Sequence, residues 1–292
     1  MNYLLILIPG ITASMGNICI RTFEHKIQKS LHDLHLYQFA YVLMVAAAFL
    51  VLSGFTLTNG TAAWLLALGF AFCLSFSTIG AAQSLLCGPM SLTSVICSCN
   101  VILPILFGCI FRQEVMGIVH IIGCILLLAT LILSGIGPKE QKKEISPKWY
   151  LYVTMSFLGN GFGAIVVSSY NILSGGTNNN SFLASAFLLS AAFLFIYFLM
   201  QGKHFPEQPR FPKMPPLFFL IAAGSAFGCF GTNFVLIYLV DTVPTSLLYP
   251  IYNGVAAVLT CLVSCLVFRE SMSLKKLITI VTGLAAIVLL NL

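Results

Sequence analysis

Hydrophobic runs of about twenty residues alternate along this chain with short polar breaks, and the charged residues are confined to those breaks. No Asp, Glu, Lys or Arg occurs between Asp33 and Arg112, or between Lys148 and Lys203. A helix needs about 20 apolar residues to span the hydrocarbon core of a bilayer, and a charge placed at its centre is unfavourable by at least ~2.5 kcal/mol. The pattern therefore predicts an all-α integral membrane protein.

Dividing the hydrophobic runs at turn signals such as Gly88-Pro89 gives ten transmembrane helices. They are predicted to cover residues 3–20, 34–53, 62–86, 90–111, 115–136, 149–173, 181–200, 217–240, 245–268 and 277–290. The longest charged segment, 138–148, lies near the middle of the chain. We interpret it as a linker between a first five-helix half, 1–137, and a second, 149–292.

Composition excludes several classes of protein. Only 8% of the residues are charged, against about 25% in a soluble domain. The net charge of +6 lies in loops with no basic stripe interleaved with aromatics, so we expect no nucleic-acid partner. The ten cysteines include no CxxC pair, and we interpret most of them as small packing residues. We expect no metal and no cofactor.

Three histidines and an aspartate cluster around the first predicted connection, at His25, His32, Asp33 and His35. Their spacing fits no standard metal template. We expect this cluster to lie in a solvated loop.

An internal repeat of about 155 residues links the two halves. AAQSLLCGPMSLTSVICS, from Ala81, aligns with LIYLVDTVPTSLLYPIYN, from Leu236, without a gap. The two segments are followed by FRQE (111–114) and FRES (268–271), where a one-residue shift aligns Glu114 with Glu270. Since five helices are an odd number, the second half is predicted to be inverted relative to the first. Inverted repeats with a binding site at their interface are a recurring transporter design.

The basic residues predict an orientation. Of the fourteen lysines and arginines, all but Arg112 lie in connections that follow odd-numbered helices. The positive-inside rule then places those connections in the cytoplasm and both termini outside. We expect a multi-pass protein of the cytoplasmic (inner) cell membrane.

Two short signatures carry a resemblance to a known family. GPMSLTSVI (88–96) and VPTSLLYPIYNG (243–254), with the ending LVFRESMSLKKLITIVTGLAAIVLLNL, resemble the drug/metabolite transporter superfamily and its EamA-like family. The resemblance covers nearly the whole chain and is clearest over 80–135 and 230–292. It implies a central cavity lined mainly by the first, third, fourth, sixth, eighth and ninth helices, with alternating access by rocking of the halves. It also implies glutamates after the fourth and ninth helices, as at Glu114 and Glu270. Many members have both termini in the cytoplasm; here we follow the charges.

Polar side chains within the predicted spans are the candidates for binding, because burial in lipid is unfavourable without partners. Ser94, Cys97 and Ser98 share one helix face, as do Tyr249, Tyr252 and Asn253, and the repeat makes these faces correspond. Tyrosines and an amide can stack on and hydrogen-bond a small solute, or hold a cation. The alternative is that such groups only join helices. The substrate-binding candidates are Asn17, Gln83, Ser94, Ser98, Asn160, Asn233, Tyr238, Tyr249, Tyr252 and Asn253.

No Asp or Glu lies at mid-membrane, where proton-coupled pumps usually carry one. We therefore expect a secondary transporter or facilitator that moves a small polar metabolite, neutral or zwitterionic, by alternating access. An exporter of organic cations or amphipathic drugs is one alternative, and a non-transporting membrane scaffold or receptor is another. An enzyme is not expected, since the spans show no convergent acid–base or metal constellation. The expected partners are a small-molecule substrate and the lipid bilayer, with the protein a monomer or homodimer.

Overall fold

The computed structural model describes residues 3–28, 30–87, 93, 96–97, 99–135, 146–202, 214–267 and 274–290. Within these ranges the regular elements are all helical, which confirms the predicted fold class. They are η1 (Tyr3–Ile6), α1 (Leu7–Lys26), α2 (Leu31–Leu52), α3 (Thr61–Cys87), η2 (Cys99–Val101), α5 (Ile102–Phe111), α6 (Ile118–Gly135), α7 (Pro147–Ser174), α8 (Asn179–Gly202), α9 (Pro216–Leu239), α10 (Thr245–Val267) and α11 (Leu274–Leu290).

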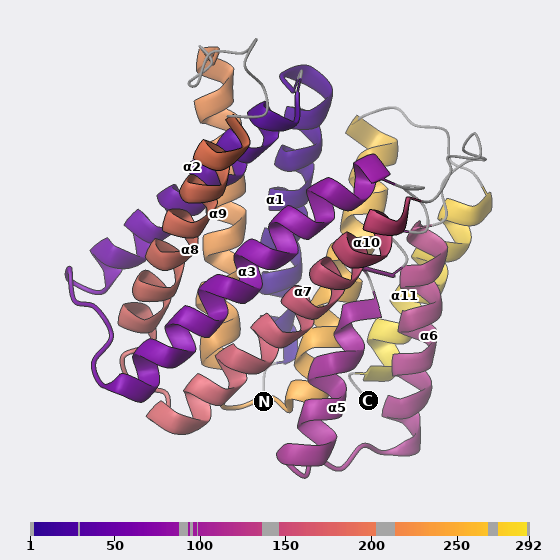
Figure 1. The fold of residues 1–292 in the computed structure, drawn as a ribbon. Helices are drawn as coiled ribbons and strands as arrows, with labels where there is room; N and C mark the ends of the chain where they lie inside the picture. Colours follow the sequence, from indigo (N-terminus) through magenta and orange to yellow (C-terminus); the bar gives the residue numbers. More distant parts are fainter. Residues whose placement is uncertain are drawn as a thin grey trace.

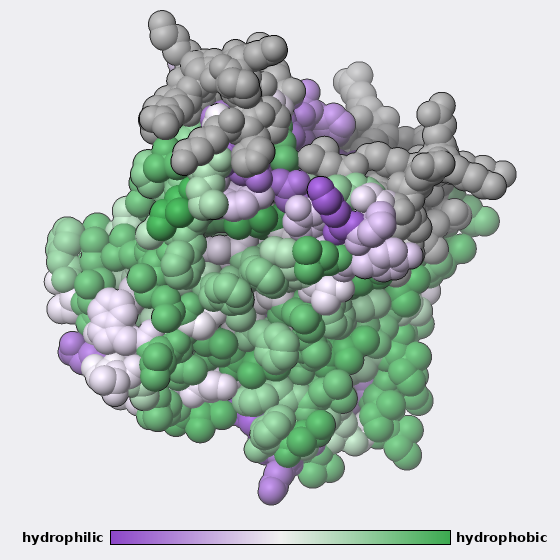
Figure 2. All heavy atoms as spheres, viewed as in Figure 1, coloured by the Kyte–Doolittle hydropathy of each residue, from purple (hydrophilic) through white to green (hydrophobic). Residues whose placement is uncertain are grey.

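The outer surface of this bundle suits a bilayer. In the described residues, α2, α3, α7, α8 and α9 are long and apolar enough to cross a membrane, and three shorter apolar helices accompany them. Figure 2 shows a broad hydrophobic belt, with hydrophilic residues mostly toward its two ends. Large apolar side chains such as Ile118 and Leu220 are 77% and 71% exposed. A surface of this kind is stable against lipid, so the protein is an all-α, multi-pass membrane protein.

Successive helices run in alternating directions across the bundle (Figure 1). The start of α1, the end of α5 and the end of α11 therefore lie at one end, which we call the terminal end. The start of α2, the end of α8 and the start of α9 lie at the opposite end. Helices α1 and α7, the first of each predicted half, run in opposite directions.

Helix pairing joins elements that are far apart in the sequence. The most extensively packed pairs are α3 with α7, α1 with α9, α2 with α8, and α6 with α11, while α5 packs on α10. Two glycines bring backbones into contact at the first two crossings. A Cβ on Gly159 would lie 2.6 Å from the Cys73 carbonyl oxygen, and one on Gly228 would lie 2.6 Å from that of Thr12. Small residues at these positions permit the close helix approach that is typical of membrane bundles.

The connection between α1 and α2 differs from the prediction. Ser30 caps α2 in a capping box with Asp33, so the helix begins at Leu31. His32 stacks on Phe198 with ring centroids 4.3 Å apart, and both His32 and His35 are 1% exposed. The expectation of a solvated loop is wrong for these residues, because they lie on the face of α2 that packs against α8. His25, at the end of α1, is exposed as expected.

The predicted first helix ends at residue 20, but α1 continues six residues further, to Lys26. The other predicted helix boundaries lie within about three residues of the observed ones, where the chain is described. The predicted linker reaches into α7, which begins at Pro147. Residues 138–145, residues 90–92, 94–95 and 98 of the predicted fourth helix, and Glu270 lie outside the described residues.

Candidate functional site

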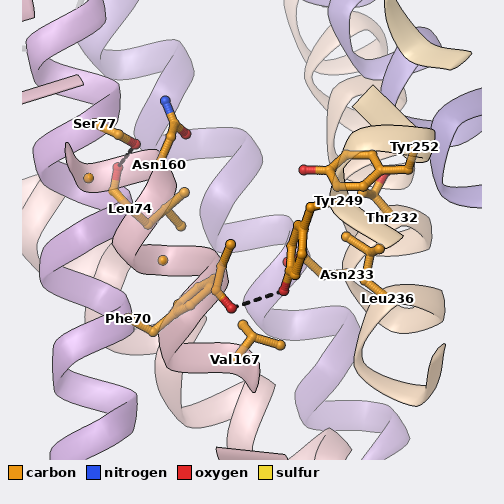
Figure 3. A pocket seen from close by; sticks show the side chains of 13 residues that line it. Phe70, Leu74, Ser77, Asn160, Val167, Thr232, Asn233, Leu236, Tyr249 and Tyr252 are labelled. Carbon is orange, nitrogen blue, oxygen red and sulfur yellow. Dashed lines mark hydrogen bonds between the residues drawn. The ribbon is translucent and has the colours of Figure 1, made fainter. Parts of the chain in front are cut away.

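A cavity of about 170 Å³ lies where α3, α7, α9 and α10 meet (Figure 3). Its lining combines aromatic, aliphatic and small residues with uncharged polar ones, and includes no charged side chain. The lining residues are Phe70, Leu74, Ser77, Gly159, Asn160, Gly163, Ala164, Val167, Thr232, Asn233, Leu236, Tyr249 and Tyr252. The apolar and aromatic lining residues belong to two separate clusters of packed residues, so the cavity lies at the boundary between these clusters.

Aromatic side chains form opposing walls of the cavity. Tyr249 and Tyr252 project from α10 with ring centroids 5.9 Å apart and planes at 65°, while Phe70 approaches from α3. The Tyr249 hydroxyl donates to the Ala164 carbonyl oxygen at 3.0 Å, which ties α10 to α7. With its hydrogen engaged, the Tyr249 hydroxyl oxygen can only accept from a ligand.

Two amides face the cavity from α7 and α9. The Asn160 side chain donates through Nδ2 to the Ser156 carbonyl oxygen at 3.1 Å, and Asn233 donates likewise to that of Cys229 at 2.9 Å. Each bond reaches back one turn on the same helix and fixes the orientation of the amide. Within the described residues, the Oδ1 atom of each amide accepts no hydrogen bond that would compete with a ligand.

The hydroxyl groups of the lining are oriented in the same manner. Ser77 donates to the Leu74 carbonyl oxygen at 3.0 Å, and Thr232 donates to that of Gly228 at 2.8 Å. Hydroxyls whose hydrogen is engaged present lone pairs. The cavity therefore offers several oriented oxygen acceptors, which suits a solute that carries N–H or O–H groups.

Four of the residues predicted from sequence meet at this cavity: Asn160, Asn233, Tyr249 and Tyr252. The apolar half of the lining, including Phe70 and Val167, was not predicted from the sequence. Nothing distinguishes these residues in the sequence from the many other apolar residues of the spans. Ser77 and Thr232 carry a usable signal, since they are polar residues within predicted spans.

The remaining candidates lie elsewhere. Gln83 is buried and donates to the Tyr197 hydroxyl at 3.0 Å. Asn253 donates to the Tyr249 carbonyl oxygen on its own helix. Tyr238 is 44% exposed, and Asn17 is exposed on α1. Ser94 and Ser98 lie outside the described residues, although Cys97, on the same predicted face, contacts Ser156 of α7.

The family resemblance implies more helices around the cavity than its described lining contains. The lining comes from α3, α7, α9 and α10, which are the third, sixth, eighth and ninth predicted helices. Helix α1 packs behind α9, where the hydroxyls of Thr12 and Thr232 lie 2.9 Å apart. In the described part of the chain, α1 therefore supports the wall rather than forming it.

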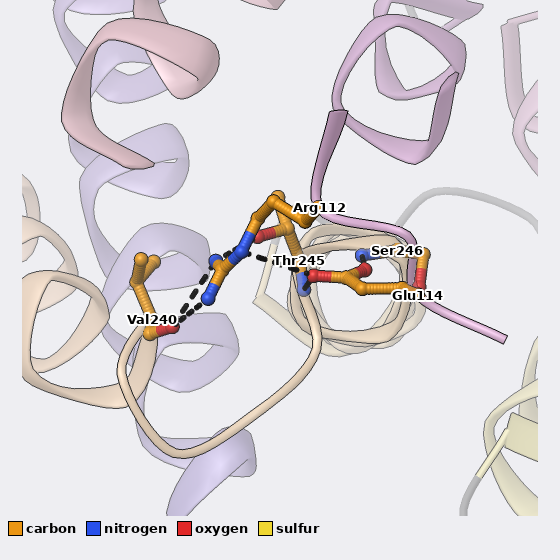
Figure 4. Close-up of polar contacts among 5 residues, drawn as sticks. All are labelled: Arg112, Glu114, Val240, Thr245 and Ser246. Atoms are coloured by element: carbon orange, nitrogen blue, oxygen red, sulfur yellow. Dashed lines mark hydrogen bonds and ion pairs between the residues drawn. The ribbon is translucent and has the colours of Figure 1, made fainter. Parts of the chain in front are cut away.

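A charged pair holds the start of α10 at the terminal end (Figure 4). The two carboxylate oxygens of Glu114 accept from the backbone N–H groups of Thr245 and Ser246, each at 2.8 Å. Arg112 Nε lies 3.4 Å from Glu114 Oε1, and the guanidinium also donates to the Val240 carbonyl oxygen and the Thr245 hydroxyl. A carboxylate at a helix N-terminus satisfies orphan amides and complements the helix dipole. We call Arg112 and Glu114 the α10 clamp.

Among the residues that the structure describes, no group of three or more His, Cys, Asp or Glu side chains is placed so that it could hold a metal ion. The cavity lining itself offers hydrogen bonding and aromatic contact by neutral groups.

Comparisons with known proteins bear on the second half of the chain and on the fold. The sequence model of the family described as Small Multidrug Resistance protein matches residues 214–282, a segment that begins just before α9 and ends within α11. That family lies within the drug/metabolite transporter superfamily, so the match supports the superfamily-level resemblance without testing the EamA-like branch. No curated protein matches the chain.

Solved structures also match this chain. One described as "Crystal structure of protein" has a TM-score of 0.75 and 15% sequence identity, and the alignment covers 97% of this chain and 95% of that chain. At this identity the similarity shows the fold alone.

Proposed function

We propose that this protein is a secondary transporter or facilitator of small polar solutes, neutral or zwitterionic, which it binds in the cavity between α3, α7, α9 and α10. The observation that carries the proposal is the uncharged lining, whose amide and hydroxyl oxygens remain open to a ligand. A cavity of mostly apolar walls with a few oriented polar groups is the usual form of a small-molecule site.

The helix pairing supports two inverted halves that rock against each other. In two related halves, each helix of the first half has a counterpart in the second, in chain order: α1 with α7, α2 with α8, α3 with α9, α5 with α10, and α6 with α11. Replacing each helix by its counterpart turns the α1–α9 pair into the α7–α3 pair. The same replacement leaves the pairs α2–α8, α5–α10 and α6–α11 unchanged. The cavity takes α3 from the first proposed half and α7, α9 and α10 from the second. Alternating access through such an interface is a common mechanism of secondary transporters.

The matched family supports membrane transport of small molecules over catalysis. Its printed name also favours a second candidate function, the export of organic cations or amphipathic drugs. The aromatic walls of the cavity suit that ligand class through cation–π contacts. In either case we propose that the terminal end, with the α10 clamp, faces the outside, and that the opposite, basic end faces the cytoplasm.

Purified protein in detergent provides the first test, through its melting temperature in the presence of amino acids, nucleobases, sugars and organic cations. A ligand that binds only the folded state raises the apparent stability, by about 2.7 kcal/mol at a hundredfold excess over Kd. The class that raises the melting temperature is then tested for flux into proteoliposomes. A neutral or zwitterionic hit supports the first function, and a hit confined to organic cations supports the second.

The chain offers a matched control for the site. Tyr252→Ala removes a cavity residue, and Tyr238→Ala makes the same change on an exposed part of α9. We expect the first variant to abolish the ligand effect and the second to retain it. Equal sensitivity of the two would refute the cavity as the binding site, and absence of flux for every class would refute transport.

A further inference from the structure

At the terminal end, the turn at Gly176 lies close to the carboxylate of Asp241 and the amide of Asn171. Gly176, in the turn between α7 and α8, has a φ of +77°. A Cβ built on Gly176 would lie 2.5 Å from Asp241 Oδ2 and 3.9 Å from Asn171 Oδ1. Because Gly176 has no side chain, the exposed Asp241 carboxylate approaches the turn where a Cβ would lie, and the Asn171 amide oxygen lies on the same side. The two oxygens come from different segments, the end of α7 and the turn between α9 and α10.

The side-chain amide of Asn171 has a hydrogen-bond partner at its nitrogen but not, within the described residues, at its oxygen. Asn171 is 1% exposed, and its Nδ2 donates to the Ile237 carbonyl oxygen. Its Oδ1 is buried and accepts no hydrogen bond from the described residues. Asn179, three residues after Gly176, is 2% exposed, and neither of its side-chain polar atoms has a partner in the described part of the chain. Buried polar atoms without partners are rare in native structures, and each such atom requires an explanation such as a bound ion or water.

The available donors define the class of ligand. Asp241 forms no hydrogen bond or ion pair within the described residues, and it supplies the one negative charge of the group. Its carboxylate and the neutral amide oxygens are hard ligands, which suit small hard cations. One carboxylate balances one positive charge, so the set favours a monovalent cation over a divalent one.

We propose that Asp241, Asn171 and the turn at Gly176 form a binding site for a small monovalent cation, either a sodium ion or the ammonium group of an amine. Asn171 lies one turn along α7 from Val167, which lines the cavity, and Ile237 follows the lining residue Leu236 on α9. The site therefore adjoins the cavity on the side of the terminal end. Since none of its residues lines the cavity, it does not depend on which solute is carried, or on transport itself.

The test is the melting temperature of the detergent-purified protein in sodium chloride, methylammonium chloride or N-methylglucamine chloride at one ionic strength. We expect sodium or methylammonium to produce a saturable rise of about 3 °C over N-methylglucamine. A response to sodium alone assigns the site to the ion, and a response to methylammonium alone assigns it to an amine. The absence of a saturable response to either cation would overturn the proposal.

Single substitutions test whether the cation-dependent rise in melting temperature arises at this site. Asp241→Asn should abolish it, whereas Glu24→Gln, which removes an exposed acid from the other end of the bundle, should retain it. A response retained in Asp241→Asn would overturn the assignment. If Asp241→Asn does not fold, Asn171→Ser provides the second test, and we expect it to weaken the apparent affinity about tenfold. An unchanged affinity in that variant would also count against the site.

Discussion

In the cavity beside Tyr249 and Tyr252, amide and hydroxyl oxygens remain open to a ligand. One turn earlier on α10, in the α10 clamp, backbone amides bind both carboxylate oxygens of Glu114. Both regions place polar atoms within a largely apolar bundle. In the clamp, the partners are backbone amides of α10 and the Arg112 guanidinium, so the protein itself satisfies the charge. In the cavity, one N–H of each amide is engaged by its own helix, and the two amide oxygens accept no hydrogen bond within the described residues.

This difference teaches how a functional polar group is distinguished from an architectural one. The residue type and its depth in a span are similar in the two cases. What separates them is whether the remaining hydrogen-bonding capacity finds a partner within the protein. This distinction would be wrong if substitutions at the cavity mainly lowered stability, or if substitutions at the clamp mainly weakened ligand binding.

The largest expected effect is on stability, at the clamp. Glu114→Ala would leave the first amides of α10 without their acceptor and Arg112 without its counter-ion, and we expect a loss of about 2–3 kcal/mol. Glu114→Gln, which keeps one acceptor oxygen, should lose about half as much. Thermal unfolding in detergent measures both. A Glu114→Ala protein with wild-type stability would show that the clamp does not hold α10.

At the cavity we expect the opposite result, a loss of binding with little loss of stability. Asn160→Ala and Asn233→Ala each remove one open amide, and each should weaken the affinity for a ligand found by the stability screen about tenfold. Asn17→Ala makes the same change at an exposed position of α1 and serves as the control. Titration of the ligand against melting temperature measures all three. Equal affinities across the three variants would show that the amides of Asn160 and Asn233 do not bind the ligand.

Much of the fold could be predicted because the bilayer imposes a simple rule. Backbone groups in lipid must be paired within the segment, so long uncharged runs become helices. The rule is weakest where the chain leaves the membrane. At the first connection, helix α2 begins at a capping box formed by Ser30 and Asp33, and its polar first turns pack against α8. A count of charged and polar residues cannot distinguish that helix from a loop.

Only part of the candidate site could be predicted. Asn160, Asn233, Tyr249 and Tyr252 combine a polar group with a position within a span, and the structure places all four at the cavity. Gln83 has the same sequence signal, yet it bonds to Tyr197 of α8. The choice between these outcomes depends on which helices are neighbours, and that information lies in the tertiary packing rather than in the local sequence.

A smaller effect separates the two tyrosines of α10. Tyr249→Phe removes the hydroxyl that donates to the Ala164 carbonyl oxygen, and we expect a loss of about 1 kcal/mol in stability. Tyr252→Phe should leave stability within about 0.5 kcal/mol of wild type while reducing ligand affinity. Unfolding and ligand titration of the two variants give the comparison. A stability loss as large in Tyr252→Phe would mean that this hydroxyl also joins helices.

The smallest effect is expected at Tyr238. Its hydroxyl donates to Asn180 Oδ1 at 3.4 Å on an exposed surface, where water can replace the partner. Tyr238→Phe should therefore change stability by less than about 0.5 kcal/mol. It should also leave ligand affinity and flux unchanged, because the side chain lies outside the cavity. A loss of flux at wild-type stability would place Tyr238 on the path of the solute, and the site would then extend beyond the cavity toward the terminal end.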